Sequence, residues 1–178
     1  MSGINFENKT VVVTGAGNGL GKAYALEFAN RGANVVVNDI GGSVTGDGSE
    51  NAPADVVVEE INSFGGSAVA NYDSVATKQG GESIIESALS NFGSVDAVVN
   101  NAGILRDKSF AKMEEDDLNA IIDVHLKGTF FVCQPAFIQM KEQGYGRFVN
   151  VSPPSGLFGN FGQLNYGAAK MGIVGLTN

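Results

Sequence analysis

The sequence contains one cysteine and no tryptophan, and it lacks long apolar runs. Cys133 can form no disulfide within the chain, and its apolar neighbours predict a small buried side chain in a reducing compartment. No run approaches the roughly 20 apolar residues that a membrane span needs. The start MSGINFENKT does not resemble a secretory signal, and the final GLTN is not a peroxisomal tripeptide address. We therefore expect no membrane partner and no targeting signal in this sequence.

Basic residues are also scarce. The 11 Lys and Arg residues are outnumbered by 19 Asp and Glu residues, which gives a formal net charge of -8. Basic surfaces bind nucleic acids and anionic membranes, so this balance argues against both as partners. The remaining composition, 43% hydrophobic and 17% charged, is typical of one globular domain with a buried core.

Short β-branched runs alternate with segments of helical period. The expected strands are 10–14, 34–38, 67–71, 95–100 and 146–151, and the expected helices are 19–31, 53–64, 77–92 and 114–143. This alternation predicts an α/β fold, a Rossmann-type doubly wound parallel sheet with strand order 3-2-1-4-5. Only eight residues follow Lys170. We therefore expect a single domain, 1–178, that is truncated at the C-terminal side and lacks the last strands.

Two features interrupt the regular pattern. Residues 40–52 are polar and rich in Gly and Ser, which predicts a long, mobile loop. Pro135 falls inside the expected helix 114–143, where it removes a hydrogen bond and should bend the axis.

A glycine-rich turn follows the first expected strand and leads into the first helix. Gly15, Gly19 and Gly21 have the spacing G-x-x-x-G-x-G, a variant of the dinucleotide fingerprint. Gly15 allows a tight turn, Gly19 lets a pyrophosphate approach the backbone, and Gly21 lets the helix pack closely on the strand. The free N–H groups at the helix start, with Asn18 beside them, favour phosphate. A plain strand-to-helix turn is the alternative, but the turn sits where a dinucleotide site requires it.

Polar residues after the next strands fit the same ligand. Asp39 can accept hydrogen bonds from both ribose hydroxyls, and it would repel a 2′-phosphate. Because 38–48 contains no Arg or Lys to receive that phosphate, NAD is predicted rather than NADP. Asp73 and Ser74 could bond the adenine edge, and NNAG (100–103) ends the fourth strand where such sheets bind ligands.

Tyr166 and Lys170 are four residues apart, on one face of an expected helix. An ammonium beside a phenol favours the phenolate, so such a pair suits acid–base catalysis. Together, TGAGNGLG, NNAG and the Y-x-x-x-K pair resemble the motifs of the short-chain dehydrogenase/reductase family, over residues 5–178. The stretches VVVNDIGG, VANYDSV, VHLKGTFF and GLFGNFGQLNY look like the subgroup of peroxisomal type 2 (3R)-hydroxyacyl-CoA dehydrogenases.

This resemblance implies oxidation of a (3R)-3-hydroxyacyl-CoA to a 3-oxoacyl-CoA with NAD, in fatty-acid β-oxidation. It implies a homodimer and a peroxisomal location, with the cytoplasm as the alternative, and no metal. Tyr166 would be the general base, and Lys170 would lower its pKa and hold the nicotinamide ribose. His125 stands where most of the family has Asn, and would support a proton relay or simply pack. Further residues expected at the cofactor are Leu20, Val75, Asn101, Ala102 and Gly103.

Pro153 departs from the family pattern. The family's catalytic Ser lies 13 residues before the Tyr, and the proline at this position has no hydroxyl. Ser152 and Ser155 flank the gap, and either could substitute if the loop shifts. The family's later segment, which closes over the nicotinamide and forms the substrate lid, also lies outside these residues. Two hypotheses follow: an NAD-dependent 3-hydroxyacyl-CoA dehydrogenase, or a non-catalytic NAD-binding module that is either a fragment or a pseudoenzyme.

Overall fold

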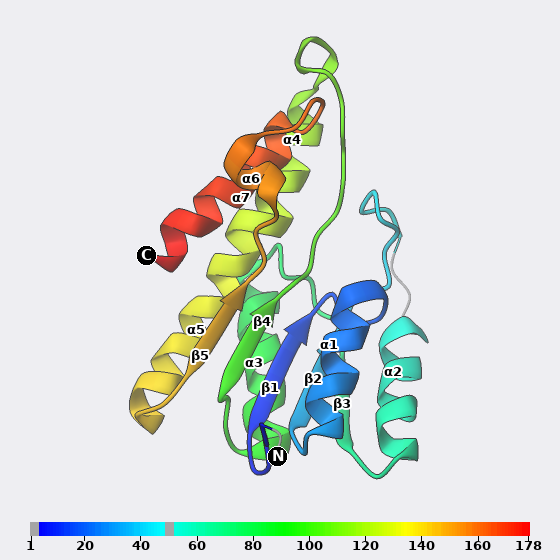
Figure 1. Cartoon of the computed structure of the whole chain (residues 1–178), viewed down its shortest axis with the longest axis vertical. Coiled ribbons are helices and arrows are strands. Elements are labelled where there is room, and N and C mark those ends of the chain that lie inside the picture. The colour runs from blue at the N-terminus through cyan, green and yellow to red at the C-terminus, as the bar shows by residue number, and fades with distance from the viewer. Residues whose placement is uncertain (1–3, 49–51) are drawn as a thin grey trace.

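Five parallel strands form one sheet in the order β3-β2-β1-β4-β5 (Figure 1). The computed structural model describes residues 4–48 and 52–178. The strands are β1 (Thr10–Thr14), β2 (Asn34–Asn38), β3 (Ser67–Asn71), β4 (Ala97–Asn100) and β5 (Arg147–Asn150). The predicted strand order is confirmed, and β4 and β5 have four residues each where six were predicted.

Helices cover both faces of the sheet, α1 and α2 on one and α3 and α5 on the other (Figure 1). In chain order they are α1 (Gly19–Asn30), α2 (Ala52–Ser63), α3 (Lys78–Phe92), the 3-10 turn η1 (Phe110–Lys112), α4 (Glu115–Ile121), the π-helical η2 (Ile122–Lys127), α5 (Gly128–Gln143), α6 (Pro154–Phe158) and α7 (Leu164–Thr177). Successive residues of β1 point to opposite faces. Val11 and Val13 therefore pack against α1 and α2, and Val12 packs against α3 and α5. Both faces are buried, which is why the strands read as continuous valine runs.

The single helix expected over 114–143 is continuous from Glu115 to Gln143 but contains the π-helical turn η2. A π turn holds one extra residue within an α-helix and is frequent at functional sites. The residues of η2 are ordinary helix formers, so sequence periodicity gives no sign of it. Pro135 lies inside α5, downstream of this turn. The bend predicted there stays a prediction.

By length and composition alone, the same Glu115–Gln143 run could cross a membrane, with a mean hydropathy of 1.2 in its 18-residue window. This corrects the expectation that no segment would reach that length. Core helices of soluble proteins pass the same test, and Val132, Ala136 and Met140 of this run belong to the core under the sheet. The helix is therefore weak support for a membrane span.

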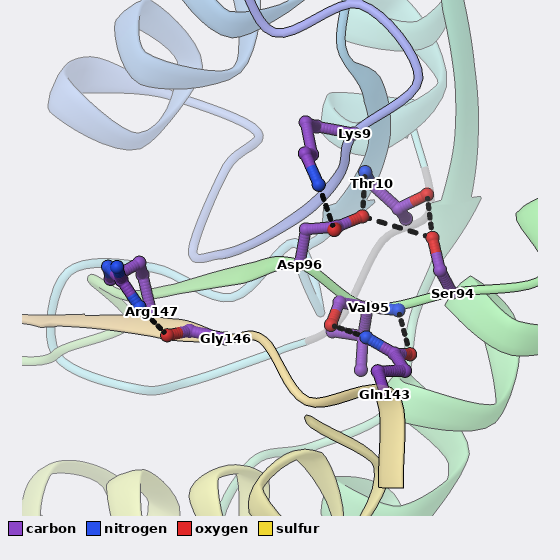
Figure 2. A network of polar contacts seen from close by, with 8 residues as sticks. All are labelled: Lys9, Thr10, Ser94, Val95, Asp96, Gln143, Gly146 and Arg147. Atoms are coloured by element: carbon purple, nitrogen blue, oxygen red, sulfur yellow. Dashed lines mark hydrogen bonds and ion pairs between the residues drawn. The ribbon is translucent and has the colours of Figure 1, made fainter. Parts of the chain in front are cut away.

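A carboxylate joins β1 to β4 at their amino ends (Figure 2). Asp96 accepts hydrogen bonds from Lys9 Nζ at 2.9 Å, from the Thr10 N–H at 2.9 Å and from Ser94 Oγ at 3.0 Å. The network holds the two central strands in register. It lies at the opposite end of the sheet from the loops that follow the strands.

Candidate active site

The glycine-rich turn connects β1 to α1 with one close-packed side and one open side. Gly15 and Gly19 have positive φ angles of 63° and 54°, a backbone conformation that favours glycine. A Cβ on Gly21 would lie 2.0 Å from the Gly15 carbonyl oxygen, so α1 approaches the turn as closely as only glycine permits. A Cβ on Gly19 would meet nothing within 4 Å. The backbone of Gly19 is therefore open to a ligand.

Helix α1 begins without a side-chain cap. The Asn18 side chain makes no capping hydrogen bond, and the first turn contains no acidic residue. The first N–H groups of a helix lack partners within it, and they lie at the positive end of its dipole. Because Asn18 and Gly19 line a cavity, this helix start suits a phosphate ligand.

The cavity has a volume of about 550 Å³ and lies at the carboxyl ends of the central strands. The predicted cofactor residues that line it are Gly15, Asn18, Gly19, Asp39, Asp73, Ser74, Val75, Asn101, Ala102 and Gly103. Of the other predicted residues, Leu20 is 64% exposed and Gly21 packs under the turn. Tyr166 and Lys170 lie outside the lining. The cavity is thus lined by most of the predicted cofactor residues, and the Tyr/Lys pair lies outside its lining.

Asp39 lies between the glycine turn and the loop after β2. Its Oδ2 accepts a hydrogen bond from the Gly17 N–H at 2.8 Å, and its Oδ1 accepts one from the Gly41 N–H at 2.7 Å. Each oxygen keeps a further lone pair for a hydroxyl donor. Asp73 lines the same cavity, and its Oδ2 accepts from Ser83 Oγ at 2.6 Å and from Asn71 Nδ2 at 3.0 Å. Asp39 is held beside the glycine turn, where the prediction places the ribose.

The loop that follows β2 forms part of the cavity lining. We call residues 41–48, which belong to the segment 40–52 expected as a long mobile loop, the cover loop; residues 49–51 lie outside the described ranges. The Leu105 N–H donates to Val44 O at 2.8 Å, and Arg106 Nε donates to Thr45 O at 3.1 Å. These bonds join the cover loop to the segment that follows β4.

Arg106 puts a cation into the cavity lining. Residues 38–48 contain no Arg or Lys, and Arg106 comes from a distant segment that the fold brings alongside. Its Nη2 lies 4.0 Å from Asp47 Oδ1 of the cover loop. Sequence offers one signal for it, its position three residues after NNAG.

Tyr166 and Lys170 lie one turn apart on α7. Lys170 is 3% exposed, its Nζ donates to Val151 O at 2.7 Å, and burial lowers its pKa to about 8. Burial, and then the charge of Asp107, raises the pKa of Tyr166. The expected lowering by Lys170 is not found, because the ammonium bonds a backbone carbonyl and lies 5.6 Å from the Tyr166 ring centroid.

His125 of the π turn lies against this pair. It is 2% exposed, and its Nε2 lies 2.8 Å from Ile104 O and 3.1 Å from Ile104 N. Its Nδ1 is buried without a hydrogen-bond partner among the described residues. Burial, and then the charge of Lys170, lowers the pKa of His125 to about 4, so the imidazole is neutral at pH 7. The His125 ring packs edge to face on the Tyr166 ring, with the two centroids 5.0 Å apart. His125 therefore packs directly against the Tyr/Lys pair.

Ser152 and Ser155, which flank Pro153, differ in the hydrogen bonding of their hydroxyl groups. Ser152 Oγ donates to the backbone carbonyl of Lys170 at 3.2 Å, so its hydroxyl is bonded to α7. Ser155 is half-buried in the short helix α6, directly after Pro154. Of the two, Ser155 is the one whose hydroxyl could replace the family's donor without breaking that bond to α7.

Cys133 is half-buried rather than fully buried, which corrects the expectation from its apolar neighbours. Its Sγ accepts a hydrogen bond from Asn100 Nδ2 at 3.1 Å. Burial raises the pKa of the thiol to about 11, so it stays protonated at neutral pH.

A family model described as short chain dehydrogenase matches residues 9–178. The chain belongs to the short-chain dehydrogenase family. Members of this family generally bind NAD or NADP. The glycine turn, the cavity and the Tyr/Lys pair thus occur in a chain whose family binds a nicotinamide dinucleotide.

Several relatives are named for longer, multifunctional enzymes. The peroxisomal hydratase-dehydrogenase-epimerase of Saccharomyces cerevisiae is 56% identical over 174 residues, which cover 98% of this chain and 19% of that protein. The peroxisomal multifunctional enzyme type 2 of Mus musculus is 54% identical over 177 residues, covering 99% and 24%. The solved full-length type 2 enzyme of Drosophila melanogaster matches with a TM-score of 0.81 and 50% identity, covering 98% and 28%. The chain thus spans between 19% and 28% of the length of these relatives.

Proposed function

We propose that the chain is the dehydrogenase domain of an enzyme that oxidises a (3R)-3-hydroxyacyl-CoA to a 3-oxoacyl-CoA with NAD, in fatty-acid β-oxidation. The observation that carries the proposal is the placement of Asp39, the uncapped start of α1 and the NNAG segment around one cavity. The names of the relatives support a dehydrogenase activity and a peroxisomal setting.

NAD would supply the hydride acceptor for this oxidation. The Gly19 backbone and the N–H groups of α1 would hold its phosphates, and Asp39 would accept from its ribose hydroxyls. The Asp39 carboxylate, fixed by two backbone N–H groups, would also repel a 2′-phosphate. Arg106 lines the same cavity, donates to Thr45 O, and has its Nη2 4.0 Å from the exposed Asp47 carboxylate.

Tyr166 would take the proton from the substrate hydroxyl as a phenolate. Its raised pKa makes the phenolate scarce at neutral pH, and Lys170 is the group that could change this. The ammonium of Lys170 is held at the end of β5 by Val151 O. A ligand that draws it toward the Tyr166 ring would favour the phenolate.

A non-catalytic NAD-binding fragment is the second candidate function. Pro153 favours it, because the position lacks a hydroxyl and the hydroxyl of Ser152 is bonded to the Lys170 backbone. Losing one donor to developing charge typically costs about 10²–10³ in rate. The two candidates share the cofactor site and differ in turnover alone.

Self-association is a further part of the proposal. On α5, Phe130 is 43%, Phe137 59% and Ile138 57% exposed. Adjacent exposed apolar side chains on one helix support a homodimer of the kind the family resemblance implies. Light scattering of the purified chain tests this, and a monomer at all concentrations would contradict it.

Isothermal titration with NAD and NADP tests the cofactor site directly. We expect saturable binding of NAD, weak binding of NADP, and at least about a tenfold loss of NAD affinity in Asp39→Ala, since a charge-assisted hydrogen bond contributes about 1.5–3 kcal/mol. Asp116→Ala, at an exposed position on α4, is the matched control and should bind like the parent. Turnover of (3R)- and (3S)-3-hydroxyacyl-CoA then separates the candidates: activity with the 3R substrate supports the enzyme, and binding without turnover supports the fragment.

A further inference from the structure

We propose that Asn165 is a positioning residue that sets the place of Tyr166 relative to Lys170. It does so by tying the first turn of α7 to the segment 104–108 and to α4. The assignment of Tyr166 and Lys170 as a catalytic pair rests on the proposed function. The hydrogen bonds of Asn165 do not depend on it.

The Asn165 side chain is fully buried and fully bonded. Its Nδ2 donates to Arg106 O at 3.1 Å and to Asp117 O at 3.2 Å, and its Oδ1 accepts from the Tyr166 N–H at 2.8 Å. Two donors and one acceptor thus connect three segments of the chain. Buried polar groups in this state specify one arrangement, because leaving any of them unpaired is unfavourable.

Two further hydrogen bonds, both more exposed to solvent than those of Asn165, join the same segments. The Lys108 N–H donates to Gly162 O at 3.0 Å, and Gln163 Nε2 donates to Asp107 Oδ2 at 2.8 Å. Exposed hydrogen bonds exchange readily with water and contribute less than buried ones. Asn165 is therefore the main link between α7 and the segment that follows NNAG.

Lys170 is anchored elsewhere. Its Nζ donates to Val151 O at 2.7 Å, and its backbone carbonyl accepts from Ser152 Oγ at 3.2 Å. A Cβ on Gly156 would lie 2.5 Å from the Lys170 Cβ, so α6 also packs tightly there. Lys170 is fixed to the end of β5, and Tyr166 is fixed through Asn165 to the segment 104–108 and to α4. Loss of Asn165 should therefore move Tyr166 and leave Lys170 in place.

Helix capping alone does not explain this residue. A cap requires one oxygen acceptor, which Ser or Asp would supply equally well. Asn165 also uses both amide hydrogens on carbonyls of other segments, and an acceptor-only carboxylate could not do this. The amide is needed for the connection.

The test compares Asn165→Ala with Asn119→Ala, an exposed asparagine on α4, by ¹³C NMR of tyrosines labelled at Cζ. The titratable side chains that face Tyr166 among the described residues are Asp107, Lys170 and His125. The Tyr166 resonance is identified by its absence from the spectrum of Tyr166→Phe. We expect Asn165→Ala to shift this resonance and lower its titration midpoint, since the ring becomes less buried and leaves Asp107. The other tyrosines, NAD affinity and the Asn119→Ala spectrum should match the parent.

Kinetics give the second measurement. A misplacement of about 1 Å can cost about 10²-fold in rate, so kcat should fall by that order while the KM for NAD is unchanged. A lowered Tm alone, with the Tyr166 resonance and kcat of the parent, would overturn the proposal. If Asn165→Ala does not fold, Asn165→Ser, which keeps an acceptor and one donor, is measured in the same way and decides by the same criteria. A parent without turnover refutes the proposed function, and the NMR result still decides the role of Asn165.

Discussion

His125 and Tyr166 pack edge to face, with ring centroids 5.0 Å apart. This edge-to-face contact places the buried, neutral imidazole of His125 against the phenol ring of the predicted catalytic pair. Protonation of His125 would place a charge in this packed region and close to the Lys170 ammonium. The free energy of unfolding at acidic pH should therefore depend on the protonation of His125.

The free energy of unfolding should fall as the pH drops from about 6.5 to about 4. His125 has a pKa of about 4 when folded and about 6.5 when unfolded, so the unfolded chain binds more protons in this window. The difference corresponds to a loss on the order of 3 kcal/mol below pH 4. Urea unfolding at pH 7.5 and pH 4.5 measures it. Carboxylates also titrate near pH 4, so His125→Asn is the reference, and parallel pH profiles of parent and variant would contradict the assignment.

Removal of the Asp96 carboxylate should destabilise the chain without weakening NAD binding. Burial alone would raise the pKa of Asp96, but hydrogen bonds from Thr10, Lys9 and Ser94 outweigh it and lower the pKa (Figure 2). The contribution is therefore present above the unfolded value of about 3.9 and is lost as the pH falls through the lower folded value. At pH 7, Asp96→Ala leaves the buried Thr10 N–H unpaired, at a cost of about 1–3 kcal/mol.

Thermal and urea unfolding of Asp96→Ala measure that cost. Asp116→Ala, exposed on α4, should unfold like the parent. Because the network lies at the amino ends of the strands, calorimetry should give the NAD affinity of the parent. An equal loss of NAD affinity and stability would show that the two ends of the sheet are coupled.

The fold could be predicted from the sequence because its determinants are local. Valine runs such as 11–13 and 35–37 are buried on both faces, as is typical of a parallel sheet covered by helices. The glycine spacing after β1 marked the turn for the same reason, since Gly15 and Gly21 are required within a few residues of each other. The π turn was missed, because its residues do not differ from those of an ordinary helix.

The site was predicted less completely because several of its residues act through distant contacts. Arg106 reaches the cover loop and Asn165 reaches Arg106 and Asp117 through hydrogen bonds that span about 50–60 positions of sequence. Composition and spacing give no sign of such pairings. The raised pKa of Tyr166 was not foreseen for a similar reason, since burial of the ring and the nearby Asp107 cause it and both depend on the folded chain.

Gly21→Ala should destabilise the chain and weaken NAD binding together. The new Cβ would lie 2.0 Å from Gly15 O, which forces α1 away from the turn and typically costs about 1–3 kcal/mol. Gly175→Ala is the matched control, because a Cβ there meets nothing within 4 Å and alanine favours a helix by up to about 1 kcal/mol. Urea unfolding and NAD calorimetry of both variants measure the effects. A Gly21→Ala protein with the NAD affinity of the parent would exclude a role for the turn in binding.

Pro153→Ser should raise the rate of 3-hydroxyacyl-CoA oxidation by about 10²–10³-fold, because it restores a hydroxyl donor where the family resemblance places one. NAD affinity should not change, since Pro153 is not part of the cavity lining. Pro154→Ser is the control, because it adds a hydroxyl at the exposed neighbouring position and should leave the rate unaltered. Initial rates at saturating NAD measure all three proteins.

The response of the parent to Ser155→Ala shows whether Ser155 supplies the hydroxyl that Pro153 lacks. Ser152 would have to give up its bond to the Lys170 carbonyl to act as the donor, whereas Ser155 would not. If the parent turns over substrate and Ser155→Ala abolishes this, Ser155 already replaces the missing hydroxyl, and the gain in Pro153→Ser should be small. If the parent is inactive and Pro153→Ser is active, one side chain separates a dehydrogenase from a protein that only binds NAD. Inactivity of both would show that the chain needs more than this hydroxyl for turnover.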